Sequence, residues 1–385
     1  MGCNSQPPSA RRDSLVMAVN LGHLFRRSSQ LSLACISLVA LLGPACGGPQ
    51  PAAVTHSPSP LSVSSTSQFF DPSPRELVAG FAPGIGGNMA CSSSDLVFDD
   101  GPQHTLYTTG VTTFQPRKLL TINGSIGPIS MSGLWAAFAV YAQSGQELSP
   151  LGSWSVYGVE ITSGRSVVLA SGTDSTQLSE LPFPTVGDGF IVWDELMSVG
   201  NKVLWRYDTN SGARIQIKLP SGTYPVRPSA SGGTLLFLDN NRDSAHASET
   251  WLGRGGEPLL LNLASGQITH LAIGSVVAKA LLTPTRAVWI SGSTTSSSIY
   301  DIQEVAIPGG SPRTLTETTD LAPLWANDQI TVWLGGIRGA VTAHIGARTA
   351  VVSPDLTVSP GGVALCGSNF YYGGPNLSLK VAYIG

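Results

Sequence analysis

The sequence predicts an all-β protein, a β-propeller of seven four-stranded blades, with a six-bladed ring as the alternative. Three observations predict it. An aromatic residue recurs at the end of a repeated window about every 45 residues, a second hairpin follows most windows, and the composition favours strands and turns. Charged residues are only 12% of the chain, whereas there are 44 glycines and 27 prolines, a mixture typical of short strands joined by tight turns. The net charge of −3 provides no long-range attraction for nucleic acid, which we exclude as a partner.

Residues 1–45 are predicted to be a secretory signal peptide with an N-terminal extension. Arg26 and Arg27 precede an apolar run over 31–45, and small residues stand just before Cys46. A basic region, a short apolar run and a small-residue cleavage site are typical of an export signal. The run is too short to span a bilayer. Met17 is an alternative start of translation.

The residues around Cys46 resemble a bacterial lipoprotein signal, because Ala45 precedes the cysteine and two glycines follow it. The resemblance implies that the Cys46 thiol carries a lipid. Gly43 stands where that family prefers leucine, and Gly43-Pro44-Ala45 also fits the ordinary cleavage rule, which would release the protein. Residues 46–70 are rich in Pro, Ser and Thr and are predicted to be a flexible tether. Both alternatives place the chain outside the cytoplasm, in the cell envelope or secreted.

The predicted propeller covers 71–385. Its seven windows, each ending in an aromatic residue, are 89–98, 129–138, 184–193, 228–237, 280–289, 324–333 and 362–371. The residue before the aromatic and the third residue of each window are apolar in all seven copies, and turn residues such as Ser132-Gly133 lie between them. This pattern indicates strand, tight turn and strand. A β-sandwich with fortuitous spacing is the alternative fold.

A second hairpin follows several windows, with glycine at the turn positions 164, 212, 266 and 309–310. The chain ends soon after the seventh window, with room for one more strand over 379–384. We therefore expect 76–81 to supply the outermost strand of the seventh blade and to close the ring. Cys91 and Cys366 lie in the first strands of repeats one and seven, predicted neighbours across this closure. They form either a disulfide or two buried thiols.

The sixth repeat resembles the TolB-type, WD40-like propeller repeat. Residues 311–316 read Ser-Pro-Arg-Thr-Leu-Thr and are followed by Pro323-Leu324-Trp325, and Pro184 and Pro228 begin two other windows in a similar way. The resemblance implies a periplasmic or envelope propeller that binds proteins or cell-wall components. The Ser-Pro-Asp-Gly turn of that family is missing, and seven repeats differ from its six.

The sequence contains no catalytic motif. Gly-x-Ser-x-Gly is absent. No two of the four histidines that follow the tether have the spacing of metal ligands, and we expect solvated loop positions for all four: His104, His246, His270 and His344. No catalytic residue and no cofactor is assigned, and an enzyme is not expected. The alternative is a carbohydrate-active or other hydrolytic propeller, which would gather carboxylates such as Asp95, Asp188 and Asp328 at the central channel.

Asp239, Asn241 and Asp243 alternate as in a calcium-binding loop. Ser244 stands where such a loop needs glycine, and Trp251 where it needs glutamate, so we favour a turn and assign no metal. A calcium-dependent adhesion module is a third hypothesis. Asp99 and Asp194 follow their aromatic residues in a similar way and are predicted to be turn residues.

Three tryptophans end repeat windows and are predicted core residues, Trp193, Trp289 and Trp333, whereas Trp251 is predicted to be a loop aromatic. From these features we expect a monomeric, exported and lipid-anchored binding or scaffold module. Its partner is expected to be a protein or a cell-wall component.

Overall fold

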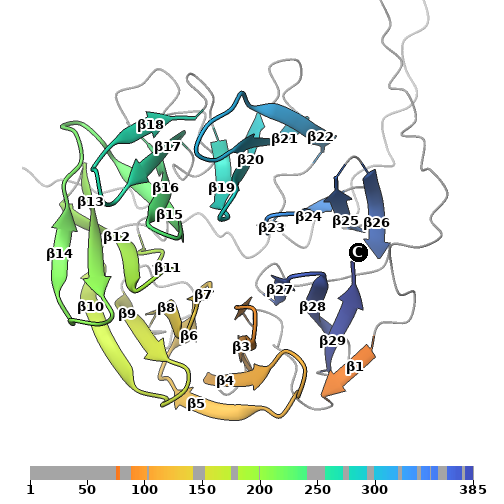
Figure 1. The fold of residues 1–385 in the computed structure, drawn as a ribbon. Helices are drawn as coiled ribbons and strands as arrows, with labels where there is room; N and C mark the ends of the chain where they lie inside the picture. Colours follow the sequence, from red (N-terminus) through yellow and green to blue (C-terminus); the bar gives the residue numbers. More distant parts are fainter. Residues whose placement is uncertain are drawn as a thin grey trace, which may run out of the picture. The chain divides into compact units, whose positions relative to one another are not determined.

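A computed structural model describes the chain over residues 75–78, 88–101, 104–141, 152–174, 181–198, 200–240, 256–271, 277–292, 299–319, 323–335, 340–346, 348–353, 362–374 and 378–384. These residues form seven antiparallel sheets arranged around one axis, so the predicted seven-bladed propeller is confirmed (Figure 1). The predicted signal peptide, Cys46 and the tether lie outside the described residues. No helix in the described ranges is long and apolar enough to cross a membrane.

The strands of each blade follow one another from the axis outward. Blade 1 contains β2 (Met89–Cys91), β3 (Asp95–Asp99), β4 (Thr105–Gly110) and β5 (Arg117–Thr121). Blade 2 contains β7 (Ser130–Ser132), β8 (Trp135–Tyr141), β9 (Gly152–Glu160) and β10 (Ser166–Asp174), with β6 (Ser125–Ile126) also paired to β8. Blade 3 contains β11 (Thr185–Gly187), β12 (Phe190–Ser198), β13 (Asn201–Asp208) and β14 (Arg214–Ile217). Blade 4 contains β15 (Pro225–Ser231), β16 (Thr234–Asp239), β17 (Glu257–Asn262) and β18 (Ile268–His270).

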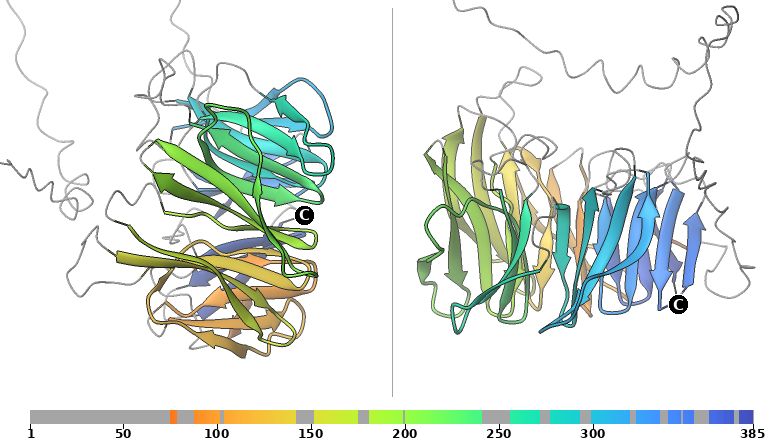
Figure 2. Two further views of the ribbon diagram at one scale, coloured as in Figure 1. Left: turned by 90° about the vertical axis from the view of Figure 1, so that its left-hand side faces the viewer. Right: turned by 90° about the horizontal axis from the view of Figure 1, so that it is seen from above.

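The remaining blades continue the order around the ring. Blade 5 contains β19 (Val277–Leu282), β20 (Arg286–Gly292), β21 (Tyr300–Ala306) and β22 (Arg313–Thr318). Blade 6 contains β23 (Leu324–Ala326), β24 (Ile330–Gly335), β25 (Ala340–Ile345) and β26 (Arg348–Ser353). Blade 7 contains β27 (Val363–Cys366), β28 (Asn369–Gly374), β29 (Ser378–Tyr383) and, outermost, β1 (Arg75–Val78). Seen from the side, the strands run between the two faces of the ring (Figure 2).

Blade 7 is shared between the two ends of the propeller sequence. The early strand β1 pairs antiparallel with the last strand β29, with Arg75 opposite Val381 and Glu76 opposite Lys380. The predicted closure of the ring by a strand near residue 76 is therefore confirmed. Because β1 occupies the outer side of β29, the final strand of the chain is not left as an open sheet edge.

The predicted aromatic column forms the core between blades. All seven residues are buried, with none more than 3% exposed: Phe98, Phe138, Trp193, Phe237, Trp289, Trp333 and Tyr371. In blades 2 to 6 the aromatic packs against the residue that precedes the aromatic of the previous blade. Phe138 packs in one cluster with Val97, and Trp193 in another with Ala137. Each blade thus buries its large ring against its neighbour, which is how a repeat protein is stabilised.

The seventh predicted window, 362–371, is displaced by one residue from the pattern of the other blades. Tyr371 is buried, but it packs toward blade 1 in a cluster with Phe98, whereas Phe370 and Tyr372 pack toward blade 6. Phe370 therefore faces the neighbour that the aromatic residue faces in the earlier blades. Side chains alternate along a strand, so a displacement of one residue places an aromatic on the opposite face of the blade. The window ending at Tyr371 was aligned one residue out of phase.

Most of the predicted turn glycines adopt the left-handed backbone conformation that tight turns need, whereas Gly309 and Gly310 do not. Gly133 and Gly232 join the two inner strands of their blades, each at φ 55°. Gly164, Gly212 and Gly266 join the two outer strands, at φ 71° to 74°. Glycine reaches positive φ without the steric cost of a Cβ atom. The connections of an antiparallel blade alternate between its two ends. The turn between the first two strands and the turn between the last two strands therefore lie at the same end of the ring.

Candidate functional site

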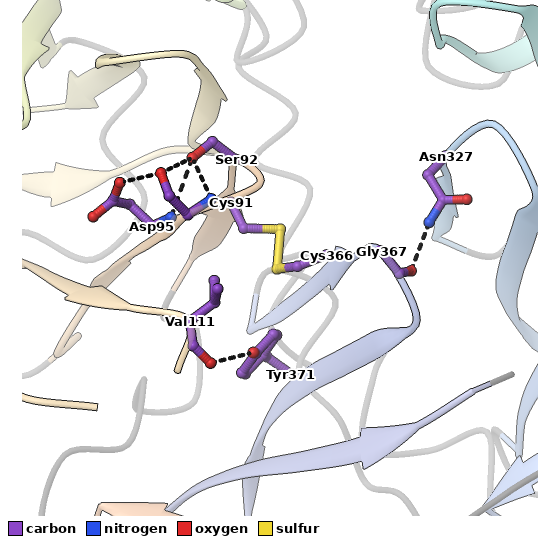
Figure 3. Close-up of a disulfide and its surroundings, with 9 residues drawn as sticks. Cys91, Ser92, Asp95, Val111, Asn327, Cys366, Gly367 and Tyr371 are labelled. Carbon is purple, nitrogen blue, oxygen red and sulfur yellow. Dashed lines mark hydrogen bonds between the residues drawn. A yellow bond between two sulfur atoms is a disulfide. The ribbon is translucent and has the colours of Figure 1, made fainter. Parts of the chain in front are cut away.

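The closing seam joins the innermost strands of blades 1 and 7. Cys91 and Cys366 are bonded there as a disulfide, with 5.8 Å between their Cα atoms (Figure 3). Nearby, the Tyr371 hydroxyl donates a 3.2 Å hydrogen bond to the carbonyl of Val111 in blade 1. The disulfide and the Tyr371 hydrogen bond therefore join two blades whose cysteines are 275 positions apart in the sequence.

The three carboxylates considered for a hydrolytic centre lie in separate turns. Asp95 accepts a hydrogen bond from the Ser94 hydroxyl in blade 1, and Asp188 accepts one from Ser132 of the neighbouring blade. Asp328 accepts hydrogen bonds from both the backbone N–H and the hydroxyl of Thr285. The structure does not bring these residues together, and within the described ranges no three His, Cys, Asp or Glu side chains form a group suited to a metal ion.

Hydroxyl groups connect the innermost strands of blades 2 to 5. The Ser130 oxygen accepts a hydrogen bond from the Val186 N–H, and the Thr185 oxygen accepts one from the Ala230 N–H. The Ser229 oxygen continues the series by accepting from the Leu282 N–H. Each hydroxyl is the second residue of its repeat window and each N–H belongs to the third residue of the next window. These hydrogen bonds fix the position of each innermost strand relative to that of the next blade.

Two cationic residues, Arg227 and Lys279, lie on the innermost strands of blades 4 and 5, and each is next to a β-bulge. The pairing of β15 with β16 shifts between Val226 and Ser229, and that of β19 with β20 shifts between Val277 and Lys279. Arg227 occupies the first bulge at φ 51°, a left-handed conformation that is rare for arginine. Bulges often redirect a side chain beside a functional site. The two cations, Arg227 and Lys279, are called the basic pair below.

The basic pair links four successive blades. The Arg227 guanidinium donates a 2.8 Å hydrogen bond to the Ala278 carbonyl of blade 5 and lies 5.6 Å from the ring centre of Phe183, which precedes blade 3. The Lys279 ammonium lies 5.6 Å from the ring centre of Trp325 in blade 6. Burial lowers the pKa of Lys279 to about 8, and the neighbouring charge of Arg227 adds to the shift.

Asp194 holds the bulge that carries Arg227. Its carboxylate accepts a 3.4 Å hydrogen bond from the Arg227 backbone N–H and a 2.6 Å hydrogen bond from the Phe183 N–H. The same carboxylate forms a buried ion pair with Lys202, at 2.7 Å. The charge of Asp194 is therefore balanced by Lys202.

The aspartates that follow the aromatic residues lie in the second strand of their blades, so the predicted turn position is wrong for Asp194, which is inside β12, whereas Asp99 and Asp239 end β3 and β16. Asp99, Asp194 and Asp239 each accept a hydrogen bond from a backbone N–H one or two residues before the innermost strand of the blade, donated by Asn88, Phe183 and Tyr224 respectively. Burial raises the pKa of Asp239. Of the weak calcium candidates only Asp239 is described, and one of its oxygens is used in this way. Asn241 and Asp243 lie outside the described residues.

The histidines differ partly from expectation. His344 is buried in β25 and bonds to the Thr349 hydroxyl at 2.9 Å, so the predicted solvated loop position is wrong for it. Burial lowers the pKa of His344. His270 is exposed but belongs to β18, where it pairs with Glu257 at 2.8 Å. His104 directly precedes β4, whereas His246 lies outside the described residues.

The tryptophans that end repeat windows, Trp193, Trp289 and Trp333, are core residues as predicted. Trp251 lies outside the described residues.

The sequence interpretation missed the basic pair. Arg227 precedes the fourth window and Lys279 precedes the fifth, each directly before its first residue. That shared position, occupied by a cation in two successive repeats, was a signal that could have found them. The bulges that redirect the strands carry no comparable sequence signature.

Comparisons with known proteins show the fold alone. No protein-family profile matches the chain, and no curated protein has a similar sequence. One chain of a mitotic checkpoint complex is 10% identical with a TM-score of 0.53, over 90% of this chain and 99% of that one. Oligogalacturonate lyase in complex with manganese is 13% identical with a TM-score of 0.51, over 82% of this chain and 96% of that one.

TolB from Acinetobacter baumannii is also similar, at 12% identity and a TM-score of 0.43 over 76% of this chain. The present chain covers 64% of that TolB chain, which is less than two thirds of its length. The expected resemblance to TolB-type propellers stands as a distant likeness in structure, from which no family is assigned. The lipoprotein part of that expectation remains a prediction.

Proposed function

We propose that this chain is an exported propeller, held at the cell envelope by a lipid on Cys46, that acts as a non-enzymatic binding module. Its partner in this proposal is an envelope protein or a cell-wall component. The observation that carries the proposal is the disulfide between Cys91 and Cys366, because disulfides form and persist in oxidising compartments. Reducing cytosol would leave both thiols free.

The construction of the ring supports a binding role. The seam is closed by the disulfide and by β1, and neighbouring inner strands are linked by hydrogen bonds, as between Thr185 and Ala230. A rigid scaffold lowers the entropic cost of binding, because few groups must be ordered when the partner docks. A closed ring without a free strand edge at its seam also suits a monomer.

The anchor is tested by growing cells that express the full chain with radiolabelled palmitate. We expect label on the wild-type protein and its recovery with membranes, whereas Cys46→Ser loses the label and moves to the soluble envelope fraction or the medium. Cys35→Ser is the matched control, since Cys35 lies within the apolar run of the signal. Label that persists on Cys46→Ser would contradict the anchor.

The binding role is tested by placing a photoreactive residue at single exposed positions in intact cells. Met197, at the end of β12, and Leu134, in an inner turn, lie at opposite ends of the ring, and both are about half exposed. Ile215 on the outermost strand of blade 3 is equally exposed and serves as the control. We expect a discrete crosslinked product from one end of the ring. A product from Ile215 alone, or none at all three positions, would contradict binding at an end of the ring.

A further inference from the structure

The interface between blades 5 and 6 contains a layer of buried polar side chains at one end of the ring. Most of this interface is apolar, with Val288, Ile302 and Trp333 in one buried cluster. At the end that carries the inner turns, four polar residues, each no more than 8% exposed, take the place of apolar ones: Arg286, Glu304, Thr331 and His344. These four residues are called the polar layer below.

The register of the strands places both halves of the polar layer in the same interface. On β20 Arg286 is two residues before Val288, and on β21 Glu304 lies opposite Val288, so both side chains face blade 6 as Val288 does. The two members from blade 6 are cross-strand partners on β24 and β25, on the side of Trp333 that faces blade 5. The charged members of the layer therefore face the histidine across the interface.

The surroundings of the histidine carry an excess of positive charge. The Glu304 carboxylate accepts hydrogen bonds from Arg286 and from Arg313, the latter at 2.8 Å from its Nε atom. One carboxylate is thus shared by two guanidinium groups. The same three groups act on the charge of His344, where Glu304 favours the protonated form and the two arginines oppose it. Protonation of His344 therefore sets a third positive charge against a single negative one.

The blade 6 side of the polar layer is only partly satisfied by hydrogen bonds. The Nδ1 atom of His344 bonds to the Thr349 hydroxyl at 2.9 Å. The Thr331 hydroxyl on the neighbouring strand is buried and has no hydrogen-bond partner in the described part of the chain. An unpaired polar group is costly in a buried network. We therefore expect the interface to open first at this layer.

We propose that the polar layer is an acid-sensitive joint between blades 5 and 6, in which uptake of a proton by His344 loosens the contact of the two blades. The proton comes from the solvent and converts the imidazole to an imidazolium. The imidazolium repels Arg286, whose Nε atom donates a 2.8 Å hydrogen bond to the Asn327 carbonyl in the inner turn of blade 6. Loosening therefore reaches the turn by which blade 5 holds blade 6. This inference goes beyond the proposed binding role and does not depend on it.

The direction of the pH effect follows from the position of the histidine. Burial is the largest cause that lowers the pKa of His344 below its ordinary value of 6.5. When the interface opens, the imidazole returns to its ordinary pKa and binds a proton more readily. Opening therefore becomes easier as the pH falls below 6.5, and the effect levels off below the pKa of the closed state. Glu304 responds only at lower pH, below its ordinary pKa of 4.5, so the two groups are separable.

The test is hydrogen–deuterium exchange of the full chain, with its disulfide intact, at pH 7.5 and pH 5.5. Mass spectrometry of peptides gives the rate for each blade, corrected for the intrinsic effect of pH on amide exchange. We expect faster corrected exchange at pH 5.5 in β20, β21, β24 and β25. The increase should be up to about tenfold, because pH 5.5 lies one unit below the ordinary histidine pKa of 6.5.

Blades 2 and 3 are the internal control, because their sequence contains no histidine. Their corrected exchange should be the same at both pH values. Unchanged exchange in blades 5 and 6, or an increase of the same size in every blade, overturns the proposal.

Variants assign the effect to His344. His344→Asn keeps a polar group near the Thr349 hydroxyl, and its amide does not titrate, so exchange in blades 5 and 6 should lose its dependence on pH. His270→Asn is the matched control, an exposed histidine on β18 that pairs with Glu257, and should leave the exchange of blades 5 and 6 as in the wild type. Acid-dependent exchange in these blades that persists in His344→Asn overturns the assignment.

The comparison of blades within the wild type requires no variant, so it tests the proposal even if His344→Asn fails to fold. These measurements use purified protein and no partner. Their failure leaves the binding role and the lipid anchor untouched, whereas failure of the crosslinking or of the palmitate labelling leaves the joint untouched.

Discussion

Cys91 and Cys366 lie 5.8 Å apart between their Cα atoms although 275 residues separate them in the sequence. A crosslink over so long a loop restricts the unfolded chain strongly, in the loop-entropy account of disulfides. We predict that Cys91→Ser/Cys366→Ser lowers the free energy of unfolding by about 2–5 kcal/mol. Urea unfolding with and without reductant measures this. Reductant should destabilise the wild type and leave the double variant unchanged, whereas equal unfolding midpoints would refute the prediction.

The strand β1 makes a second contribution to the same seam. Deleting residues 1–70 keeps β1 and should leave the unfolding midpoint of the propeller unchanged. Deleting 1–80 removes β1 and exposes the outer edge of β29, so we expect a lower midpoint and a greater tendency to aggregate. Thermal unfolding and light scattering of the two truncated chains compare them directly. Identical behaviour would show that β1 does not close the ring.

Removing only one charge of the buried Asp194–Lys202 ion pair is predicted to lower the free energy of unfolding strongly. Asp194→Asn leaves the Lys202 ammonium buried without its carboxylate and should destabilise the protein by about 3–5 kcal/mol. The double variant Asp194→Leu/Lys202→Met should recover part of the loss, because neither charge then remains buried. Asp188→Asn, at an exposed turn, is the control and should stay within about 0.5 kcal/mol of wild type. Urea unfolding distinguishes the three variants.

Glu304 predicts how stability depends on pH. Burial alone would raise the pKa of Glu304, but hydrogen bonds and charges from Arg313 and Arg286 outweigh it and leave the pKa lowered. A carboxyl with a lowered pKa stabilises the folded state above its unfolded pKa near 4.5, and this stabilisation is lost as the pH falls through the folded pKa. Urea midpoints between pH 7 and pH 3 should fall for the wild type.

The matched variants make that prediction specific. Glu304→Gln should be less stable than wild type at pH 7 and should show a weaker loss on acidification, because its amide does not titrate. Glu317→Gln changes an exposed carboxylate on β22 and should reproduce the wild-type pH profile. A Glu304→Gln profile that is parallel to that of the wild type would contradict the assignment of the acid loss to this residue.

Most of the fold could be predicted from the sequence because its rules are local. Buried aromatics such as Trp193 and Trp289 recur beside turn glycines, and this pattern requires only side-chain alternation and short connections. The seventh window was displaced because Phe370, Tyr371 and Tyr372 are consecutive aromatics. Only the packing against blades 6 and 1 decides which of them occupies the aromatic position.

The candidate site depends on relationships that a single sequence does not carry. Arg227 and Lys279 are 52 positions apart in the sequence, and each lies at a shift of register in the innermost strand of its blade. His344 was expected in solvent because its sequence neighbours gave no sign of Thr349 as a partner. Asp99 and Asp239 were easier to predict, because each directly follows the aromatic end of a predicted strand or its next residue, and each accepts a hydrogen bond from the backbone that enters the innermost strand of the same blade.

The most direct test of the proposed exported function is the redox state of Cys91 and Cys366 in living cells. Intact cells are treated with acid, and free thiols are then modified with a maleimide that carries a large polymer. We predict that both residues remain unmodified in the mature chain and become modified only after reduction, as expected outside the cytoplasm. Modification of both residues without a reductant, in a chain that fractionates with the cytosol, would contradict the account.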